Sequence, residues 1–228
     1  MKANTDLLDN AIWHALNSHH RHLAILSDVA ARYQPDIVAV AAVPSADPSA
    51  FDDIKNLVEI GEITALFGEP QMEDLTGWEL MDTFRVPQMV CKNLRPTPEI
   101  DAFQLTTDDV PDMLNLVALA QPGPFSTRTI EMGLYLGIRK KGQLIAMAGQ
   151  RIHLTEFCEI SAVCTHPDYR KRGYAGALTS MIAQSILDHQ ETPFLHLDPT
   201  NISAMRLYAN LGFEKRKDIP LSVLKRTS

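Results

Sequence analysis

The stretch from Glu159 to Ala177 constrains most strongly what this chain can fold into. It reads EISAVCTHPDYRKRGYAGA, and its first part is apolar and β-branched, as in a buried strand. The tripeptide His-Pro-Asp at 166–168 ends that pattern. A run of basic and small residues follows, and then a long apolar pattern with helical spacing. The stretch therefore predicts a strand, a tight turn and the N-terminus of a helix.

The predicted turn has the properties of an anion site. The first N–H groups of a helix lack internal partners and carry the positive end of the helix dipole, so a pyrophosphate can bind several of them. Small residues let phosphates approach those amides, and basic side chains add attraction. The residues concerned are Arg170, Lys171, Arg172, Gly173, Ala175 and Gly176. The spacings of the dinucleotide fingerprint and of the nucleotide P-loop are absent, so the pattern does not indicate a site for NAD or ATP. The alternative to an anion site is a solvated basic helix start with an ordinary glycine cap.

Two motifs in this half of the chain resemble one family. Residues 170–175 read R-x-x-G-x-A after V-C-T-H-P, which is similar to the acyl-CoA loop of the GNAT superfamily of N-acyltransferases. Residues 201–213, NISAMRLYANLGF, resemble that superfamily's N-x-x-A-x-x-L-Y-x-x-x-G-F segment. Each motif alone is weak, but both occur in the expected order and separation. The resemblance covers residues 104–228, and Ala175 stands where many members have glycine.

The resemblance implies an α/β fold of the mixed α+β kind, in which a mixed, mostly antiparallel sheet is flanked by helices. It also implies that the sheet splays apart beside the strand ending near Thr165. The pantetheine arm of CoA could then pair with the backbone at Val163 and Thr165, and acetyl-CoA or CoA would be the cosubstrate. The implied cofactor-binding residues are Val163, Cys164, Thr165, Arg170, Lys171, Arg172, Gly173, Tyr174, Ala175, Gly176 and Asn201.

Acetyl transfer to an amine requires that the amine lose a proton and that the departing thiolate gain one. A lysine-like ammonium has a pKa about 3 units above neutrality, so its deprotonation at pH 7 costs about 4 kcal/mol. The resemblance places Tyr208, seven residues after Asn201, at the superfamily's usual thiolate-protonating position. The alternative role for Tyr208 is packing of its ring in the core.

Three candidates compete for the role of general base. Glu159 lies on the strand before the anion loop, where it resembles the catalytic glutamate of the superfamily's histone acetyltransferases. His196, on a later strand, occupies a position like that of the glutamate in the ribosomal-protein acetyltransferases. A chain of water molecules is the third candidate. Either side chain could instead make a structural hydrogen bond.

Charge and hydropathy limit the partners. The net charge is −7 and the pI about 5.6, whereas binding to a nucleic-acid backbone needs a clustered basic face. With 228 residues, 45% of them hydrophobic, and a mean hydropathy of −0.09, we expect a soluble globular chain. No apolar run is long enough to cross a bilayer, and residues 1–10 lack a secretory pattern. We therefore expect a cytoplasmic protein without a nucleic-acid or membrane partner.

The sequence contains no recognisable metal motif. The cysteines lack metal-ligand spacing, and we expect them to be reduced and mostly buried. They are Cys91, Cys158 and Cys164. The first helical pattern runs into a group of histidines without a cysteine or carboxylate at the usual spacing, so a polar helix end is predicted and a metal is not. These histidines are His14, His19, His20 and His22.

The first hundred residues read as a unit of their own. An apolar strand is predicted over 36–43, a helix over 48–57, and further strands over 62–67 and 78–90. Residues 93–100 contain two prolines and form the best linker. These patterns predict an N-terminal accessory α/β domain over 1–95 and a GNAT-like domain over 101–228.

The second half shows a regular succession of elements. A hairpin is predicted from strands over 134–138 and 144–152, followed by the strand over 157–165. After the helix that ends near residue 189, we expect a strand over 193–197, a helix over 203–211 and a strand over 219–224. The Pro/Gly-rich loop at 121–128 is expected to form a wall of the acceptor site.

The predicted function is transfer of an acetyl group from acetyl-CoA to a primary amine by direct attack in a ternary complex. The acceptor would be a small molecule or a peptide, and the first domain would help to shape its pocket. A CoA-binding sensor or interaction module without turnover is one alternative, and a protein-binding scaffold without a cofactor is another. The sequence specifies neither the acceptor nor the oligomeric state.

Overall fold

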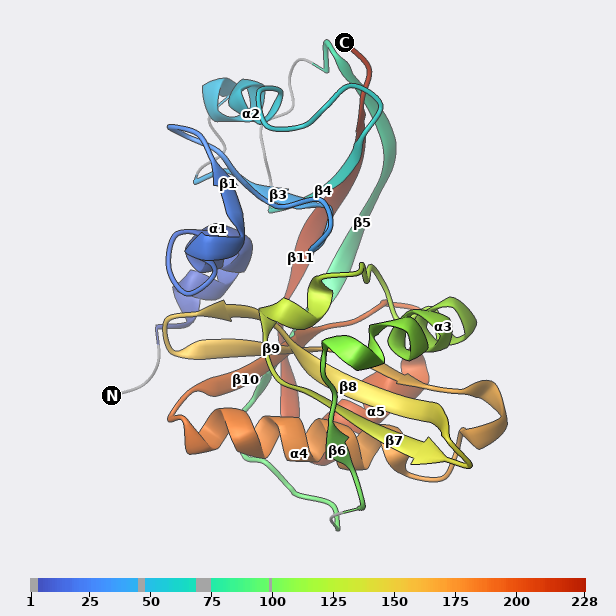
Figure 1. Ribbon diagram of the computed structural model, residues 1–228. Coiled ribbons are helices and arrows are strands. Elements are labelled where there is room, and N and C mark those ends of the chain that lie inside the picture. The colour runs from blue at the N-terminus through green and yellow to red at the C-terminus, as the bar shows by residue number, and fades with distance from the viewer. Residues whose placement is uncertain (1–3, 45–47, 69–74, 99) are drawn as a thin grey trace.

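The computed structural model describes residues 4–44, 48–68, 75–98 and 100–228. Within them an 11-stranded sheet has the order β1-β2-β3-β4-β11-β5-β10-β9-β8-β7-β6 (Figure 1). The strands are β1 (Ala24–Leu26), β2 (Ala31–Tyr33), β3 (Val40–Ala42), β4 (Ile63–Phe67), β5 (Trp78–Cys91), β6 (Phe103–Gln104), β7 (Tyr135–Lys140), β8 (Gln143–Leu154), β9 (Phe157–Thr165), β10 (Thr192–His196) and β11 (Phe213–Arg226). Parallel pairing joins β9 to β10 and β3 to β4, and the other pairs are antiparallel. The predicted mixed, mostly antiparallel sheet is confirmed.

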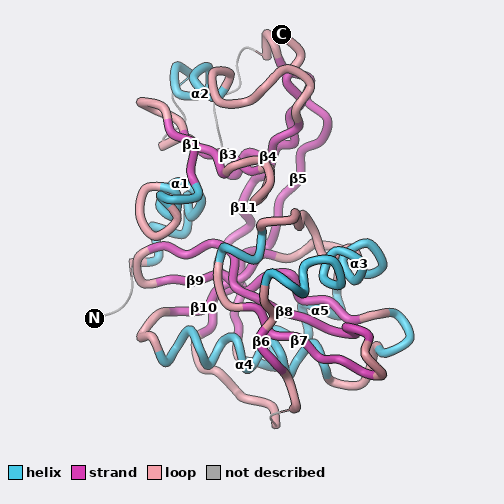
Figure 2. The backbone as a smooth tube through the Cα atoms, viewed as in Figure 1, coloured by secondary structure: helices cyan, strands magenta, loops and turns pink. Residues whose placement is uncertain are grey.

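Helices cover both faces of the part of the sheet that contains β7 to β10 (Figure 2). The α-helices are α1 (Ala11–Leu16), α2 (Pro48–Ile54), α3 (Val110–Ala120), α4 (Tyr174–Asp188) and α5 (Ile202–Leu211). On one face α4 and α5 bury Leu178 and Leu211 in a cluster with Ile160 of β9. On the other face α3 buries Met113 against Met147 of β8. No helix within the described ranges is long and apolar enough to cross a membrane.

Two long strands connect the two halves of the chain. β11 pairs with β5 from Phe213↔Cys91 to Arg226↔Trp78, and its other edge pairs with β4. The sheet therefore continues from the strands of the first half into those of the second (Figure 1). The final strand is longer than the predicted 219–224, because the charged residues at 214–218 interrupt the apolar pattern while their backbone remains extended. The proposed domain boundary between 95 and 101 stays a prediction.

One strand of the first half is shorter than its apolar pattern predicts, and β1 and β2 were not predicted. Of the expected strand over 36–43, only Val40–Ala42 pairs as β3. The preceding Ile37 and Val38 are buried in a turn, in which both of their N–H groups donate to the carbonyl of Gln34. Burial, not strand pairing, accounts for their apolar character. The predicted linker over 93–100 includes residue 99, which lies outside the described residues.

The sheet opens between β9 and β10. Their parallel pairing runs from Thr192↔Phe157 to Phe194↔Glu159 and ends there. Beyond this point β10 follows β5, with His196 opposite Gln88, whereas β9 continues beside β8. The expected splay of the sheet is therefore present, and it begins at Glu159.

A β-bulge then reverses the side-chain alternation of β9. The register with β8 shifts between Gly149↔Ser161 and Met147↔Cys164, and Ala162 has a φ of 52°. Before the bulge, Ile160 faces the cluster under α4 and α5. After it, Cys164 faces the cluster under α3, because an extra residue moves each following side chain to the opposite face. The bulge thus directs the odd-numbered residues at the end of β9 toward α4.

Candidate active site

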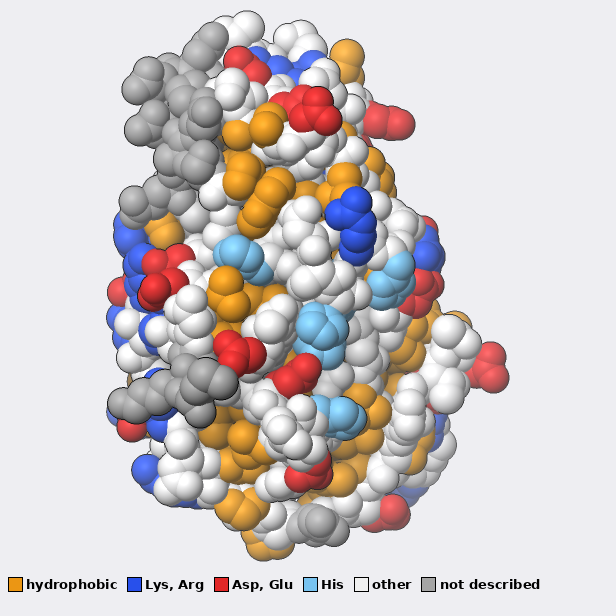
Figure 3. Space-filling model, turned by 90° about the vertical axis from the view of Figure 1, so that its left-hand side faces the viewer, with side chains coloured by type: hydrophobic (Ala, Val, Ile, Leu, Met, Phe, Trp, Pro, Cys, Tyr) orange, Lys and Arg blue, Asp and Glu red, His pale blue; other side chains and the backbone are white. Residues whose placement is uncertain are grey.

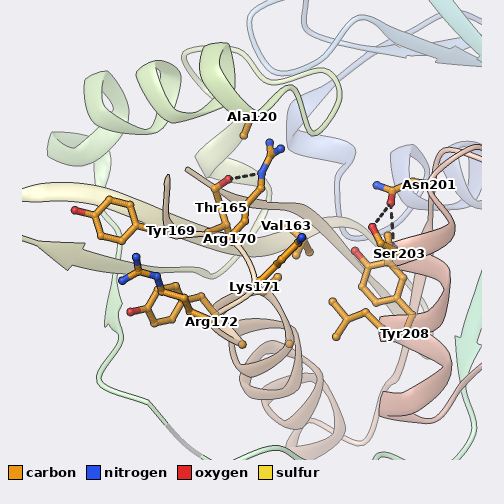
Figure 4. A pocket seen from close by; sticks show the side chains of 16 residues that line it. Ala120, Val163, Thr165, Tyr169, Arg170, Lys171, Arg172, Asn201, Ser203 and Tyr208 are labelled. Atoms are coloured by element: carbon orange, nitrogen blue, oxygen red, sulfur yellow. Dashed lines mark hydrogen bonds between the residues drawn. The ribbon is translucent and has the colours of Figure 1, made fainter. Parts of the chain in front are cut away.

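A groove of about 570 Å³ lies where β9 diverges from β10, between the N-terminus of α4 and the side of α5 (Figure 4). Most of the predicted cofactor-binding residues line it. They are Val163, Thr165, Arg170, Lys171, Arg172, Gly173, Tyr174, Ala175, Gly176 and Asn201. Tyr208 lines it too, whereas Cys164 is buried on the far side of β9. Glu159 and His196 are also not among its lining residues.

The N-terminus of α4 opens onto this groove. Gly173 is the N-cap, and the first hydrogen bond within the helix runs from the N–H of Ala177 to its carbonyl, at 3.0 Å. The N–H groups of the first three helical residues therefore have no hydrogen-bond acceptor within the helix. Gly173 has a φ of 81°, and a Cβ there would meet nothing within 4 Å, so its backbone conformation is what requires glycine.

Gly176 has a different reason to be glycine from the one that the phosphate motif suggests. An added Cβ would lie 3.1 Å from Cδ1 of Leu207 on α5. The absence of a side chain therefore lets α4 and α5 pack closely, which sets the width of the groove between them. Sequence spacing could not distinguish this packing role from close approach of a phosphate.

Three basic side chains follow one another beside the open helix terminus. Arg170 donates from Nε to the carbonyl of Thr165 at 3.3 Å, and Arg172 donates to the carbonyl of Asp168 at 3.3 Å. The guanidinium of Arg172 also lies 5.1 Å from the ring centre of Tyr169. Within the described part of the chain, Arg170, Lys171 and Arg172 form no ion pair. Their charge is therefore available to an anion.

The wall formed by β9 offers an unpaired polar atom. Oγ1 of Thr165 is buried and has no hydrogen-bond partner among the described residues. A buried hydroxyl without a partner is costly, and such groups usually find one in a ligand or a water molecule. Thr165 and Val163 both reach the groove because the bulge at Ala162 turns them toward it.

The opposite wall is the first half of α5. Asn201 caps this helix, since its Oδ1 accepts hydrogen bonds from the N–H of Ala204 at 3.0 Å and the hydroxyl of Ser203 at 2.9 Å (Figure 4). Tyr208 lies two turns further on. Burial raises the pKa of Tyr208 to about 12, with a smaller contribution from Cys164, so the phenol stays protonated at neutral pH. Its side chain is largely buried, although Tyr208 is among the residues that line the groove.

Sequence reasoning missed some of the groove's lining. The additional residues are Ala120, Tyr169, Ser203, Ala204 and Leu207. The last three lie within the 201–213 motif, on the helix face that also carries Tyr208, so helical spacing could have identified them. The loop expected to wall the acceptor site begins directly after Ala120. Its last residue, Arg128, bonds Asp36 and Gln34 of the first half.

Glu159 lies in a buried ion pair. Its side chain is 0% exposed, and the two oxygens accept hydrogen bonds from Nε and Nη2 of Arg151 at 2.7 and 2.8 Å. Burial alone would raise the pKa of Glu159. The charge and hydrogen bonds of Arg151, together with the bond from His196, outweigh burial and lower that pKa to about 2. Glu159 is therefore ionised across the physiological range.

His196 joins Glu159 to the first half of the chain. Its Nδ1 lies 2.7 Å from Oε1 of Glu159, and its Nε2 lies 3.0 Å from Nε2 of Gln88. Gln88 accepts at Oε1 from Arg216 and donates from Nε2 to the carbonyl of Leu8, which fixes the orientation of its amide. The amide nitrogen must then donate to His196. The imidazole is consequently the tautomer that donates from Nδ1 and accepts at Nε2.

A sheet that opens beside an unpartnered helix terminus matches the class of fold that the two motifs implied, and comparison with known proteins agrees. The family model described as FR47-like protein matches residues 135–219. A solved acetyltransferase of Novosphingobium aromaticivorans assigned to the GNAT family is 30% identical, with a TM-score of 0.87, over 97% of this chain and 99% of that one. The chain therefore belongs to the GNAT superfamily of N-acyltransferases.

Two further structures share the fold at lower identity. An N-acetyltransferase of Kribbella flavida is 14% identical, with a TM-score of 0.66, over 100% of this chain and 97% of that one. An N-acetyltransferase-like protein of Streptococcus suis is 17% identical, with a TM-score of 0.57, over 95% of this chain and 92% of that one. With this coverage, both matches include most of the first hundred residues. Comparison with curated proteins gave no match.

Proposed function

We propose that this protein is an acetyl-CoA-dependent N-acetyltransferase that acts on a primary amine by direct attack in a ternary complex. One observation carries the proposal. A single groove combines two features: at one end an open helix N-terminus and three cations that form no ion pair with a described residue, and on its wall the buried, protonated phenol of Tyr208. The first part suits a pyrophosphate, and the second suits a departing thiolate.

The residues of the groove fit CoA. In this proposal the amides that begin α4 and the side chains of Arg170, Lys171 and Arg172 hold the pyrophosphate. The pantetheine arm pairs with the edge of β9 that β10 leaves free after Glu159, beside Val163 and Thr165. The unpaired Oγ1 of Thr165 supports this assignment, because a polar arm offers it a hydrogen-bond partner.

Transfer begins when the neutral amine attacks the carbonyl carbon of the thioester, forming the new C–N bond. Collapse of the tetrahedral species breaks the C–S bond, and the sulfur leaves with the electron pair. We assign Tyr208 as the donor that hydrogen-bonds to this sulfur and gives it a proton. With a pKa of about 12, the phenol holds its proton until negative charge develops on the sulfur. The proton lost by the amine balances the one gained by the thiolate.

We propose His196 as the group that takes the amine's proton, and Glu159 as the residue that positions it. The carboxylate of Glu159, with its pKa near 2, is a weak base, whereas Nε2 of His196 carries a lone pair. Glu159 accepts the Nδ1–H bond and would stabilise the imidazolium. This role requires that Gln88 release Nε2 when the acceptor binds. If Gln88 does not, water remains the base.

The acceptor is proposed to approach from the face opposite α4. A cavity of about 10 Å³, room for about one water molecule, is lined there by side chains of both halves, among them Tyr33, Phe67 and Arg151. The ring of Phe67 lies 5.4 Å from that of His196. In this proposal, side chains of the first half must move apart before an amine can reach the base candidate.

The test is an acetyl-CoA-dependent thiol-release assay across amino acids, polyamines, aminoglycosides and peptides, combined with calorimetric titration of CoA. The proposal predicts CoA binding and release of the thiol with at least one amine class. CoA binding without release for any class would favour the non-catalytic sensor. Absence of CoA binding would favour a scaffold and reject the proposed function.

A further inference from the structure

Histidine side chains gather on the face of the molecule that contains α1 (Figure 3). Three potential metal ligands lie together in this region, and they come from three separate segments. His19 is in the turn after α1, His153 is near the end of β8, and Glu191 lies between α4 and β10. Their separation along the chain explains why spacing around the first histidines predicted no metal site.

The geometry of the three side chains brings their ligand atoms together. One nitrogen of each ring and one carboxylate oxygen all lie within 4.8 Å of one another. Nε2 of His153 lies 2.6 Å from Oε1 of Glu191, and the rings of His19 and His153 stack with their centres 4.2 Å apart. Ligand atoms around a tetrahedral zinc ion are about 3.3 Å apart, given bond lengths of about 2 Å. Small side-chain rotations would therefore suffice to close the site.

The backbone around each ligand is held by hydrogen bonds. Beside His19, the N–H groups of Ser18 and His20 both donate to the carbonyl of Ala15, at 3.0 and 2.9 Å. His153 is paired with Cys158 across the β8–β9 hairpin. The N–H of Glu191 donates to the carbonyl of Ile186 at 3.2 Å. Ligand binding would thus require rotation of side chains without rearrangement of the chain.

The neighbouring His20 cannot be a ligand in this arrangement. It is buried, and its ring nitrogens lie 2.9 Å from the hydroxyl of Tyr33 and 3.2 Å from the carbonyl of Met132. Its two hydrogen bonds anchor the turn that carries His19.

His19 is exposed to solvent and is the one of the three ligands that is not bonded to another. The side chains of His153 and Glu191 are hydrogen-bonded to each other. The ring of His19 is stacked on that of His153 and has no hydrogen-bond partner among the described residues. A metal ion would use the lone pair of His19 and replace the proton shared by the other two. Two imidazoles and one carboxylate form a donor set suited to zinc, with a fourth position for water.

We propose that His19, His153 and Glu191 bind a divalent transition-metal ion of the zinc class. The ion would join the turn after α1 to β8 and to the start of β10, and so fasten the first half of the chain to the acetyltransferase sheet. The start of β9 lies beside this site, whereas Thr165 at its other end lines the groove. Eight residue steps of a strand span roughly 26 Å, so the metal stands apart from the end of the groove where the pyrophosphate is proposed to bind.

The test uses the full chain without a histidine tag, stripped with a chelator. Zinc is titrated by calorimetry, and cobalt(II) is titrated while the visible absorption of a tetrahedral complex is followed. We expect one ion per chain and a rise in unfolding temperature with zinc. His153→Gln should weaken binding by at least about tenfold, since even loss of an outer partner of a metal ligand costs about 10- to 100-fold. His22→Gln removes an exposed histidine outside the cluster and should bind as the wild type does.

CoA titration shows whether the His153→Gln protein remains folded, because its groove is at the other end of β9. Glu191→Gln gives a second, independent loss of a ligand and should weaken zinc binding in the same direction. The proposal is overturned if the wild type does not bind zinc, or if zinc affinity is equal in the wild type and in His153→Gln. It is also overturned if His22→Gln loses as much affinity as His153→Gln.

Discussion

Tyr208 can be tested by removing one atom. Tyr208→Phe keeps the ring packed near Phe213 and deletes only the hydroxyl, so stability and CoA affinity should change little. The chemical step should slow by about 10²- to 10⁴-fold, the usual range for one positioned acid. Single-turnover kinetics are the appropriate measurement, because slow product release can mask a change in chemistry. Wild-type single-turnover rates in the variant would make Tyr208 a packing residue.

The base assignment predicts a particular pH dependence. His196→Gln should lower kcat/KM most near neutrality and recover activity at high pH, where the acceptor amine loses its proton without help. An unchanged shape of the pH–rate profile would exclude His196 and leave water as the base. Glu159→Gln is unsuited to this comparison, because it leaves Arg151 as a buried charge without its partner. Loss of one partner of a buried pair costs about 3 to 5 kcal/mol of stability.

Residue identities in the groove were largely predictable, whereas those around Glu159 were not. The position of Lys171 and its basic neighbours in the groove follows from a local motif, because one turn and one helix terminus define this part of the site. Arg151 and Gln88 reach Glu159 and His196 only through strand pairing. A local pattern does not encode such pairing, so the sequence could nominate the two base candidates without showing that they are bonded to each other.

At the scale of elements, the end of α5 is the most sensitive junction. Gly212 has a φ of 97°, and an added Cβ would lie within 1.9 Å of the backbone oxygen of Asn93. Gly212→Ala should therefore destabilise the protein by several kcal/mol, beyond the roughly 1 kcal/mol of left-handed strain alone. Gly142→Ala is the matched control, since Gly142 has a φ of 83° and open space around it. Equal changes in unfolding free energy for the two variants, measured by urea denaturation, would contradict the close packing at Gly212.

The bulge in β9 shows where element-level prediction stops. Its apolar pattern correctly indicated a buried strand over 157–165, but strict alternation would place Val163 on the face opposite to Ile160. The extra residue at Ala162 places both in the same cluster. Because alanine is not a residue that favours a φ of 52°, nothing in the local sequence signals the bulge.

At the scale of the whole molecule, stability should fall in acid. His20 has a pKa of about 4 in the folded chain and about 6.5 when unfolded. Its contribution is thus present above pH 6.5 and lost as the pH falls toward 4, by about 3 kcal/mol. His20→Gln should lose less unfolding free energy than the wild type over this range, whereas the exposed His22→Gln should lose as much. Equal losses in all three proteins would show that His20 does not carry the effect.

Glu159 should extend this acid sensitivity to lower pH. Its pKa of about 2 lies below the value near 4.3 of an unfolded glutamate, so its stabilisation is present above pH 4.3 and lost as the pH falls toward 2. Both groups lie where the first half of the chain meets strands of the second half. The contact between the halves is thus expected to weaken first in acid.

The overall architecture was predictable only in part. The succession of elements in the second half follows from its apolar patterns, and the splay of the sheet beside β9 follows from the family resemblance; both are found in the structure. The continuity of the sheet through both halves was not expected, because β11 lies between β4 and β5 and so joins strands from opposite ends of the chain. Such pairing is set by the packed molecule and leaves no local pattern.

The most direct measurement is calorimetric titration of CoA into the wild type and two glycine variants. Gly173→Glu places a negative side chain at the open terminus of α4, where the pyrophosphate is proposed to bind. Gly142→Glu introduces the same charge at a φ of 83°, close to the 81° of Gly173, but in the β7–β8 turn away from the groove. The account predicts that CoA binds the wild type and Gly142→Glu with similar affinity and does not bind Gly173→Glu. Unchanged CoA affinity in a folded Gly173→Glu protein would contradict it.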